Sequence, residues 1–65
     1  MISFDPLWQT MKKAGASTYT LQVNGISSST IRRIKSGSSV STNTLDTLCK
    51  ILNCSVQDII NYIPE

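Results

Sequence analysis

The chain has 65 residues, of which 40% are hydrophobic and 15% charged, and its formal net charge is +2. A chain of this length holds one small domain, here residues 1–65, and excludes a two-domain enzyme, a TIM barrel or a dinucleotide-binding fold. It has no histidine, which removes the commonest general base and the commonest metal ligand. We therefore expect neither catalysis nor a bound metal or cofactor.

Capping residues and helix stops divide the chain into five short helices and no strands. Serine and aspartate cap helix starts, proline suits the first helical position, and glycine ends a helix in a left-handed conformation. Short linkers then place the helices side by side in one all-α domain. The expected helices begin at Asp5-Pro6, Ser17, Ser27, Ser41 and Ser55, the second covering roughly Thr18–Val23 and the third ending at Lys35 or Ser36, and the stops are Gly15, Asn24-Gly25, Gly37 and Pro64.

Apolar residues at helical spacing mark the buried side of each helix. The fourth helix has the clearest pattern, because its apolar residues recur at i, i+3, i+4 and i+7. Cys49 belongs to that pattern as a small core residue, and we expect no disulfide between it and Cys54. The expected core residues are Leu7, Trp8 and Met11, then Leu21 with Tyr19 as a second candidate, Ile31 and Ile34, Leu45, Leu48, Cys49 and Leu52, and finally Val56, Ile59, Ile60 and Ile63.

The basic residues gather in the first two thirds of the chain. No acidic residue lies between Pro6 and Leu45, whereas residues 46–65 carry one lysine and three acids. This asymmetry favours a surface for an anionic partner, although an ordinary solvated helix face explains it equally well. The basic residues before Leu45 are Lys12, Lys13, Arg32, Arg33 and Lys35.

The third helix carries the argument about function. At 100° per residue, Ile31 and Ile34 point to the core and the opposite face is polar and free of acids. Short hydroxyl side chains at its start allow close approach to a groove, arginine reaches guanine or phosphate, and a helix start attracts phosphate. The face fits duplex DNA, and the alternative is an ordinary polar surface. Its residues are Ser28, Ser29, Arg32, Arg33 and Ser36.

Two stretches of the chain resemble the Cro/C1-type (XRE-like) helix-turn-helix family. Residues 25–37, Gly-Ile-Ser-Ser-Ser-Thr-Ile-Arg-Arg-Ile-Lys-Ser-Gly, resemble its turn and recognition helix, and residues 40–59 are similar to the last two helices of small bacterial and phage members. The resemblance implies a compact five-helix, lambda-repressor-like DNA-binding domain whose second and third helices form the motif. Leu21 and Gly25 are four positions apart, so either the turn is one residue short or Leu21 takes the family's small-residue position.

Carried over by position, the resemblance implies two sets of DNA contacts. The base-reading residues are Ser28, Ser29, Arg32 and Arg33, and Arg32 could take a base or a phosphate. Since serine bonds to almost any base, we expect modest sequence specificity. The implied phosphate contacts are Ser17, Thr18, Ser27, Lys35, Ser36, Ser38, Ser39 and Asn43.

The leading hypothesis is therefore a cytoplasmic transcriptional regulator, a repressor, that binds double-stranded DNA in a sequence-dependent manner. Dimerisation on a palindromic operator would strengthen the weak binding of one small domain. Ile60, Tyr62 and Ile63 of the C-terminal helix region would form the dimer surface, or else they cover the domain's own core. The alternative is a protein-interaction module, such as an antitoxin or an antirepressor partner, and an enzyme is the weakest hypothesis. No apolar run exceeds two residues, so we expect no membrane contact.

Overall fold

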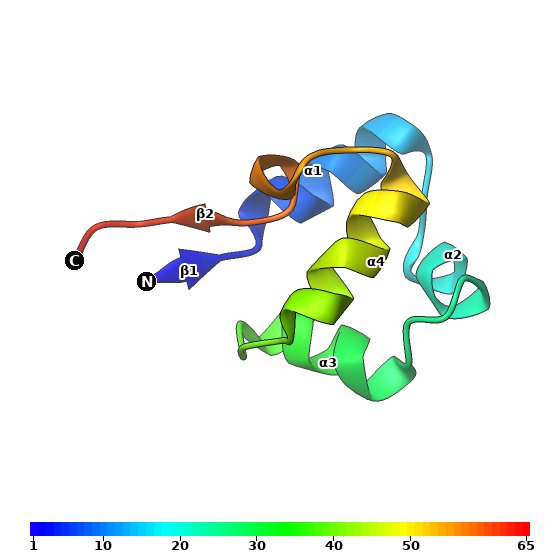
Figure 1. Cartoon of the computed structure of the whole chain (residues 1–65), viewed down its shortest axis with the longest axis horizontal. Coiled ribbons are helices and arrows are strands. Elements are labelled where there is room, and N and C mark those ends of the chain that lie inside the picture. Colours follow the sequence, from blue (N-terminus) through cyan, green and yellow to red (C-terminus); the bar gives the residue numbers. More distant parts are fainter.

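Four α-helices and a short antiparallel ribbon make up the structure, a computed structural model that describes residues 1–65 (Figure 1). We call the paired strands β1 and β2 the terminal ribbon, because they bring the two ends of the chain together. The elements in chain order are β1 (Ile2–Ser3), α1 (Asp5–Ala14), α2 (Thr18–Val23), α3 (Ser28–Ser36), α4 (Thr42–Leu52), the one-turn 3-10 helix η1 (Val56–Asp58) and β2 (Asn61–Tyr62).

Three of the predicted serine caps form as the sequence indicates. The hydroxyl oxygens of Ser17, Ser27 and Ser41 each accept a hydrogen bond from the backbone N–H three residues on, at 3.4, 3.2 and 3.2 Å. Each bond satisfies one of the free N–H groups of a helix start, which is why α2, α3 and α4 begin where they do. At α1 the prediction is off by one position, because Phe4 is the N-cap and Asp5 already lies in the helix.

Gly37 ends α3 and sets the direction of the loop to α4. Its φ of 78° lies in the left-handed region, which a residue without a Cβ adopts at least cost. There the N–H of Gly37 donates to the carbonyl of Ile34 at 3.1 Å, and the N–H of Ser38 donates to the carbonyl of Arg33 at 2.9 Å. The predicted stop at Gly37 is confirmed.

The predicted fifth helix is wrong, and so is the expectation of no strands. Only Val56–Asp58 form a helical turn, and Asn61–Tyr62 instead pair with Ile2–Ser3 in antiparallel register. The start of the expected helix does form, since the Asp58 carboxylate accepts the Ser55 N–H at 3.1 Å. The following residues are rich in isoleucine, which favours extended backbone, and the N-terminal strand offers them a partner. Consequently Val56 and Ile63, expected in the core, are exposed.

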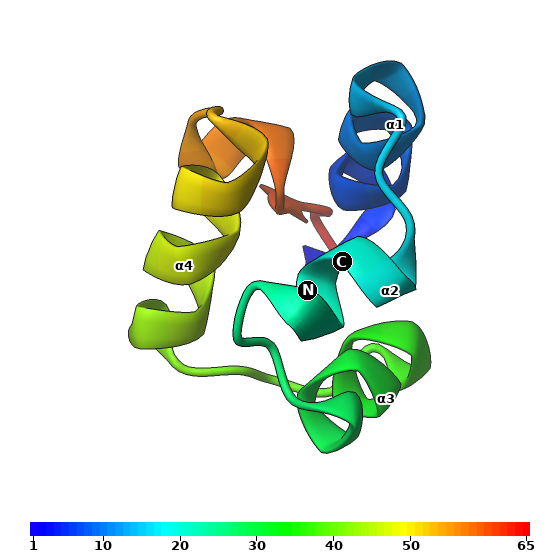
Figure 2. The ribbon, with the colours of Figure 1, turned by 90° about the vertical axis from the view of Figure 1, so that its right-hand side faces the viewer.

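The core lies where α1 packs against α4 and η1, and α2 and α3 close it from below (Figures 1 and 2). Trp8, Leu45, Cys49, Leu52 and Ile60 are half-buried around it, whereas the candidate Tyr19 is exposed. Two core residues, Phe4 and Ile26, were not predicted, because both lie outside a helical pattern. The buried apolar residues are Phe4, Leu7, Met11, Leu21, Ile26, Ile31, Ile34, Leu48 and Ile59. None of the helices has the length and apolar character to span a membrane.

Candidate nucleic-acid interface

Helix α3 lies along one edge of the molecule. In two views at right angles it forms the lower edge, with α1 at the top (Figures 1 and 2). Ile31 and Ile34 anchor it, because both side chains are buried in the core. The side of α3 that faces away from the core is therefore open to a partner along its whole length.

The exposed side of α3 is a polar stripe. Ser29, Arg32, Arg33 and Ser36 recur at i, i+3, i+4 and i+7, so they lie in line on one face of the helix. Between them is a shallow open hollow of about 390 Å³ with no apolar side chain in its lining. Ser28 lies beside the stripe in the first turn and is also exposed. The face predicted from the helical angles is thus exposed and continuous, and we call it the α3 stripe.

The cations of α3 are not neutralised within the chain. The two ion pairs of the structure are Lys50 with Asp46, at 3.0 Å, and the N-terminal ammonium with Glu65, at 3.6 Å. Arg32, Arg33 and Lys35 take part in neither, and all three are exposed. Since an anionic ligand needs to displace no internal partner to reach them, this edge is suited to a polyanion.

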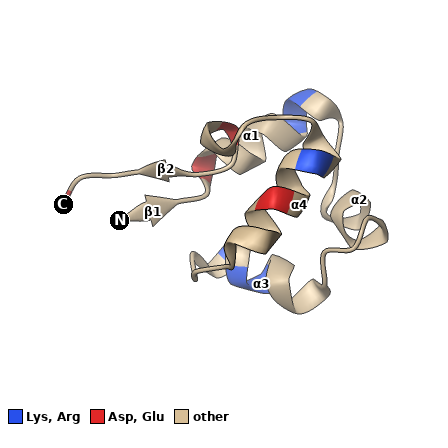
Figure 3. Cartoon of the chain, viewed as in Figure 1, with Lys and Arg blue, Asp and Glu red and all other residues tan.

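The single basic surface suggested by the charge pattern does not exist. Lys12 and Lys13 lie in the last turn of α1, at the upper edge of the molecule in Figure 3, whereas α3 forms the lower edge. They are near in sequence to the rest of the basic segment, but the turn into α2 reverses the chain between them. Three of the five basic residues, those of α3, therefore remain on one edge.

The hydroxyl groups at the end of α3 already form hydrogen bonds within the chain. The Ser36 hydroxyl donates to the Arg33 carbonyl at 2.9 Å, and the Ser36 and Ser38 oxygens are 2.9 Å apart. Since the hydrogen of Ser36 is used on the carbonyl, Ser38 must be the donor in the second bond. Phosphate oxygens only accept hydrogen bonds, so neither hydroxyl contacts a phosphate as a donor unless this chain of bonds breaks.

The serines at the start of α3 differ in whether their hydroxyl groups form hydrogen bonds within the chain. Ser27 caps the helix and its oxygen also lies 2.9 Å from Thr30 Oγ1 and 3.2 Å from Ser29 Oγ. Ser28 makes no side-chain hydrogen bond within the chain and points to solvent. Of the two predicted base-reading serines, Ser28 is therefore free and Ser29 is partly engaged.

Further polar groups lie at the starts of the helices before and after α3. Ser17 and Thr18 lie at the start of α2, and Asn43 lies in the first turn of α4. The loop before α4 adds backbone donors that sequence reasoning missed: the N–H groups of Ser39, Val40 and Ser41 make no hydrogen bond within the chain. Only the N–H of Ser41 could have been expected from the sequence, because it belongs to the start of a capped helix, where N–H groups have no carbonyl partner.

The two cysteines do not form a metal centre or a disulfide. Cys49 and Cys54 are free thiols, both half-buried, and no group of three potential ligands lies close enough to hold a metal. Burial raises the pKa of the Cys54 thiol above its ordinary value, and the neighbouring Cys49 and Asp58 raise it further. A raised thiol pKa lowers the fraction of reactive thiolate, so Cys54 has the character of a packing residue.

Helix α2, the turn after it and α3 form a helix-turn-helix, in which α3 is the exposed second helix. The chain belongs to the Cro/C1-type HTH DNA-binding domain family, whose model matches residues 6–65. It is also similar to the crystal structure of the transcriptional regulator VanUg (Form II), with 29% sequence identity, a TM-score of 0.88, and coverage of 98% of this chain and 87% of that chain. No curated protein matches the chain. The resemblance stated from the sequence is thereby confirmed.

Proposed function

We propose that this DNA-binding domain is a transcriptional repressor that recognises duplex DNA in a sequence-dependent manner by placing α3 in the major groove. The observation that carries the proposal is the α3 stripe, an exposed and acid-free row of hydroxyl and guanidinium groups on a firmly anchored helix. The major groove of duplex DNA admits one α-helix, so α3 can enter it with this stripe towards the bases.

Arg33 and Arg32 are the principal base-reading residues in this proposal. A guanidinium presents parallel N–H donors that match O6 and N7 of guanine. Neither arginine forms an ion pair within the chain that DNA binding would have to break. Arg32 could equally hold a phosphate, because a guanidinium pairs with phosphate as well as with guanine. Ser28 and Ser29 add short, adaptable contacts that discriminate weakly between bases, so most of the specificity comes from the arginines.

The phosphate contacts surround the stripe. Lys35 supplies a free charge, and Thr18, Ser39 and Asn43 present donors from the starts of α2 and α4 and the loop between α3 and α4. The remaining serines are retained as contacts that require their internal hydrogen bonds to rearrange, and they are Ser17, Ser27, Ser36 and Ser38. Contacts on both sides of α3 would fix its tilt in the groove.

A protein partner on this edge fits the structure less well. Protein interfaces are centred on aromatic or aliphatic anchors, and the α3 stripe has none. A regulator that occupies its operator excludes other proteins from the same duplex, which is the basis of repression in this proposal.

In vitro selection from a random duplex library, at an ionic strength of roughly 0.1–0.15 M, tests the proposal. We expect enrichment of one motif that contains guanine, with about 1–3 kcal/mol of binding free energy lost on that motif in Arg33→Ala. The loss on unrelated duplex should be smaller, because there Arg33 contributes only its charge. Recovery of duplex without enrichment would contradict sequence-dependent recognition. No recovery at all would contradict DNA binding by this edge and favour the protein-interaction module.

A further inference from the structure

The two cysteines of the chain lie together at the C-terminal end of α4. Cys49 belongs to the last turn of the helix, and Asn53 ends the helix in the left-handed region with a φ of 50°. The N–H of Cys54 then donates to the carbonyl of Cys49 at 3.1 Å. A bond of this span is characteristic of the Schellman motif, in which the two residues that it joins bring their side chains into contact. The proposed DNA interface uses neither thiol.

The backbone at this helix end allows a disulfide between the two residues. The carbonyl oxygen of Cys49 and the amide nitrogen of Cys54 are 3.1 Å apart. Standard bond lengths then limit the distance between the two Cα atoms to at most about 7 Å. Disulfides in proteins usually join Cα atoms that are roughly 4.4–6.8 Å apart. The hydrogen bond therefore holds the pair at a separation that a disulfide can bridge.

The two thiol groups also approach each other. Both side chains are half-buried and pack against the core. Burial raises the pKa of the Cys54 thiol, and Cys49 raises it further through its charge and through a side-chain hydrogen bond. A hydrogen bond between two thiols requires their sulfur atoms to be in contact. The atoms that a disulfide would join are therefore already neighbours.

Cys54 is more open to small reagents than Cys49. A shallow hollow of about 330 Å³ lies between the end of α1 and the end of α4, and Cys54 belongs to its lining. Cys49 lines none of the hollows on the surface of the structure. A small molecule in this hollow therefore reaches the sulfur of Cys54 first, and the sulfur of Cys49 lies behind it.

We propose that Cys49 and Cys54 form a redox site, which a low-molecular-weight disulfide such as glutathione disulfide oxidises to an intrachain disulfide. The Cys54 thiolate attacks one sulfur of the small disulfide, forms a mixed disulfide and releases the first small thiol. The Cys49 thiolate then attacks the Cys54 sulfur, which releases the second small thiol and closes the Cys49–Cys54 bond. The pair loses two electrons and two protons, and the small disulfide takes them up as two thiols. The free thiols of the structure are the reduced state of this site.

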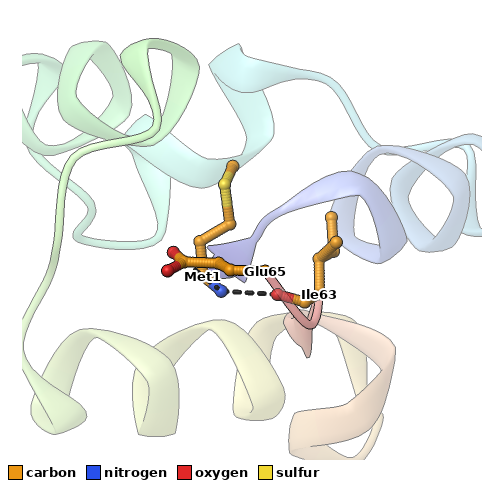
Figure 4. A network of polar contacts seen from close by, with 3 residues as sticks. All are labelled: Met1, Ile63 and Glu65. Carbon is orange, nitrogen blue, oxygen red and sulfur yellow. Dashed lines mark hydrogen bonds and ion pairs between the residues drawn. The ribbon is translucent and has the colours of Figure 1, made fainter.

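The bond would fix the first residues of the C-terminal segment, whose far end is already held. There the N-terminal ammonium donates a hydrogen bond to the carbonyl of Ile63 at 2.6 Å (Figure 4), and the N–H of Ile63 donates to the carbonyl of Met1 at 2.7 Å. At the near end, the N–H of Cys54 holds the segment to α4 through a hydrogen bond alone. A covalent link at this point also restricts the unfolded chain, so oxidation should stabilise the fold.

The redox site lies away from the α3 stripe. The end of α4 and η1 pack near α1 at the upper edge of the molecule, whereas α3 forms the lower edge (Figures 1 and 2). Oxidation should therefore change the stability of the domain and leave the α3 stripe in place. The inference does not depend on the proposed function, because none of its steps involves DNA.

Intact-mass spectrometry of the folded chain, incubated with glutathione disulfide and then treated with a maleimide to block free thiols, tests the inference. Because a raised thiol pKa slows the first attack, the incubation is continued until the masses no longer change. We expect the wild-type chain to lose two hydrogen atoms, retain no glutathione and return to the dithiol on reduction. Cys49→Ser should stop at the mixed disulfide and retain one glutathione. Cys54→Ser should react at least about tenfold more slowly, because its remaining thiol is less accessible.

Thermal unfolding of the same samples tests the effect of the bond and establishes that each variant is folded. Closure of the loop from Cys49 to Cys54 should raise the unfolding midpoint of the wild-type chain by roughly 10 °C, and the midpoint of Cys54→Ser should not respond to glutathione disulfide. A midpoint that does not rise on oxidation would overturn the stabilising role. A wild-type chain that retains glutathione, joins to a second chain, or stays reduced where the urea-unfolded chain is oxidised would overturn the redox site itself.

Discussion

The position of the lysines predicts how salt affects DNA binding. Lys35 lies on α3, and Lys13 lies in the last turn of α1 at the opposite edge of the molecule (Figure 3). Neither forms an ion pair, so Lys35→Ala and Lys13→Ala remove the same charge from sites that differ only in their distance from the proposed interface. The affinity for a short unrelated duplex, measured by fluorescence anisotropy over a series of salt concentrations, compares them directly.

The size of the effect follows from the number of cations on α3. Each neutralised phosphate contributes about −0.9 to the slope of log K against log salt, so Arg32, Arg33 and Lys35 give a slope of about −2.7 per bound monomer. Lys35→Ala should reduce this to about −1.8. Between 50 and 200 mM salt, a fourfold range, affinity then falls by roughly 40-fold for wild type and roughly 12-fold for Lys35→Ala. Lys13→Ala should follow the wild-type curve, because screening removes charges beyond about 10 Å.

Two results would refute this reasoning. Equal changes of slope in the two variants would mean that α1 and α3 both contact DNA, which the arrangement of the fold does not allow for one duplex. A wild-type slope near zero would mean that cations do not drive binding at all, and the edge formed by α3 would then have to serve another ligand. The slope must be measured at a stoichiometry established for the same duplex, since a dimer doubles the number of contacts.

The remaining predictions concern stability and the thiols. Gly37→Ala meets no steric obstacle, so its cost is the left-handed backbone alone, about 1–2 kcal/mol of unfolding free energy in urea; a neutral effect would contradict the assigned φ. Ser41→Ala removes the α4 cap and should cost about 1 kcal/mol, which Ser41→Asn should restore. Leu48→Ala empties a fully buried site and should cost about 2–5 kcal/mol, far more than an exposed substitution. Because burial raises the Cys54 pKa above 9.0, its alkylation should still accelerate above pH 9, and the stability linked to the neutral thiol should be lost as pH rises through the folded-state pKa. A plateau in the alkylation rate below pH 9 would contradict this.

Helix boundaries could be predicted from the sequence because caps act locally. Ser17, Ser27 and Ser41 each reach an N–H three residues away, and Gly37 needs only its own backbone freedom to stop α3. Buried isoleucines at helical spacing then fix which side of α3 faces the core. The exposure of the α3 stripe follows from the same pattern without any knowledge of the other helices.

Pairing between distant segments could not be predicted in this way. The strand at Asn61–Tyr62 exists because Ile2–Ser3 lies beside it. No feature of residues 55–63 indicates that they pair with the start of the chain. The Ser55–Asp58 bond, the local signal that indicated a helix, does form, but it stabilises a single turn. The prediction of a single basic surface was wrong for the same reason. Lys12 and Lys13 are close to the α3 cations along the chain, but the fold separates them in space.

Assigning functional residues by position in a motif also overcounts hydrogen-bond donors. Ser36 and Ser38 occupy positions expected to contact phosphate, yet their hydroxyl hydrogens are used along the path from Ser38 to Ser36 to the Arg33 carbonyl. These bonds stabilise the last turn of α3 next to Arg33, so their direct effect is on the position of a residue that we propose reads a base. The unbonded N–H groups of the loop from Ser39 to Ser41 are better phosphate donors, because they are free before DNA arrives and depend on no side chain. The groups on this edge that can donate to phosphate are therefore the N–H and O–H groups that form no hydrogen bond within the chain, and a sequence motif does not show which those are.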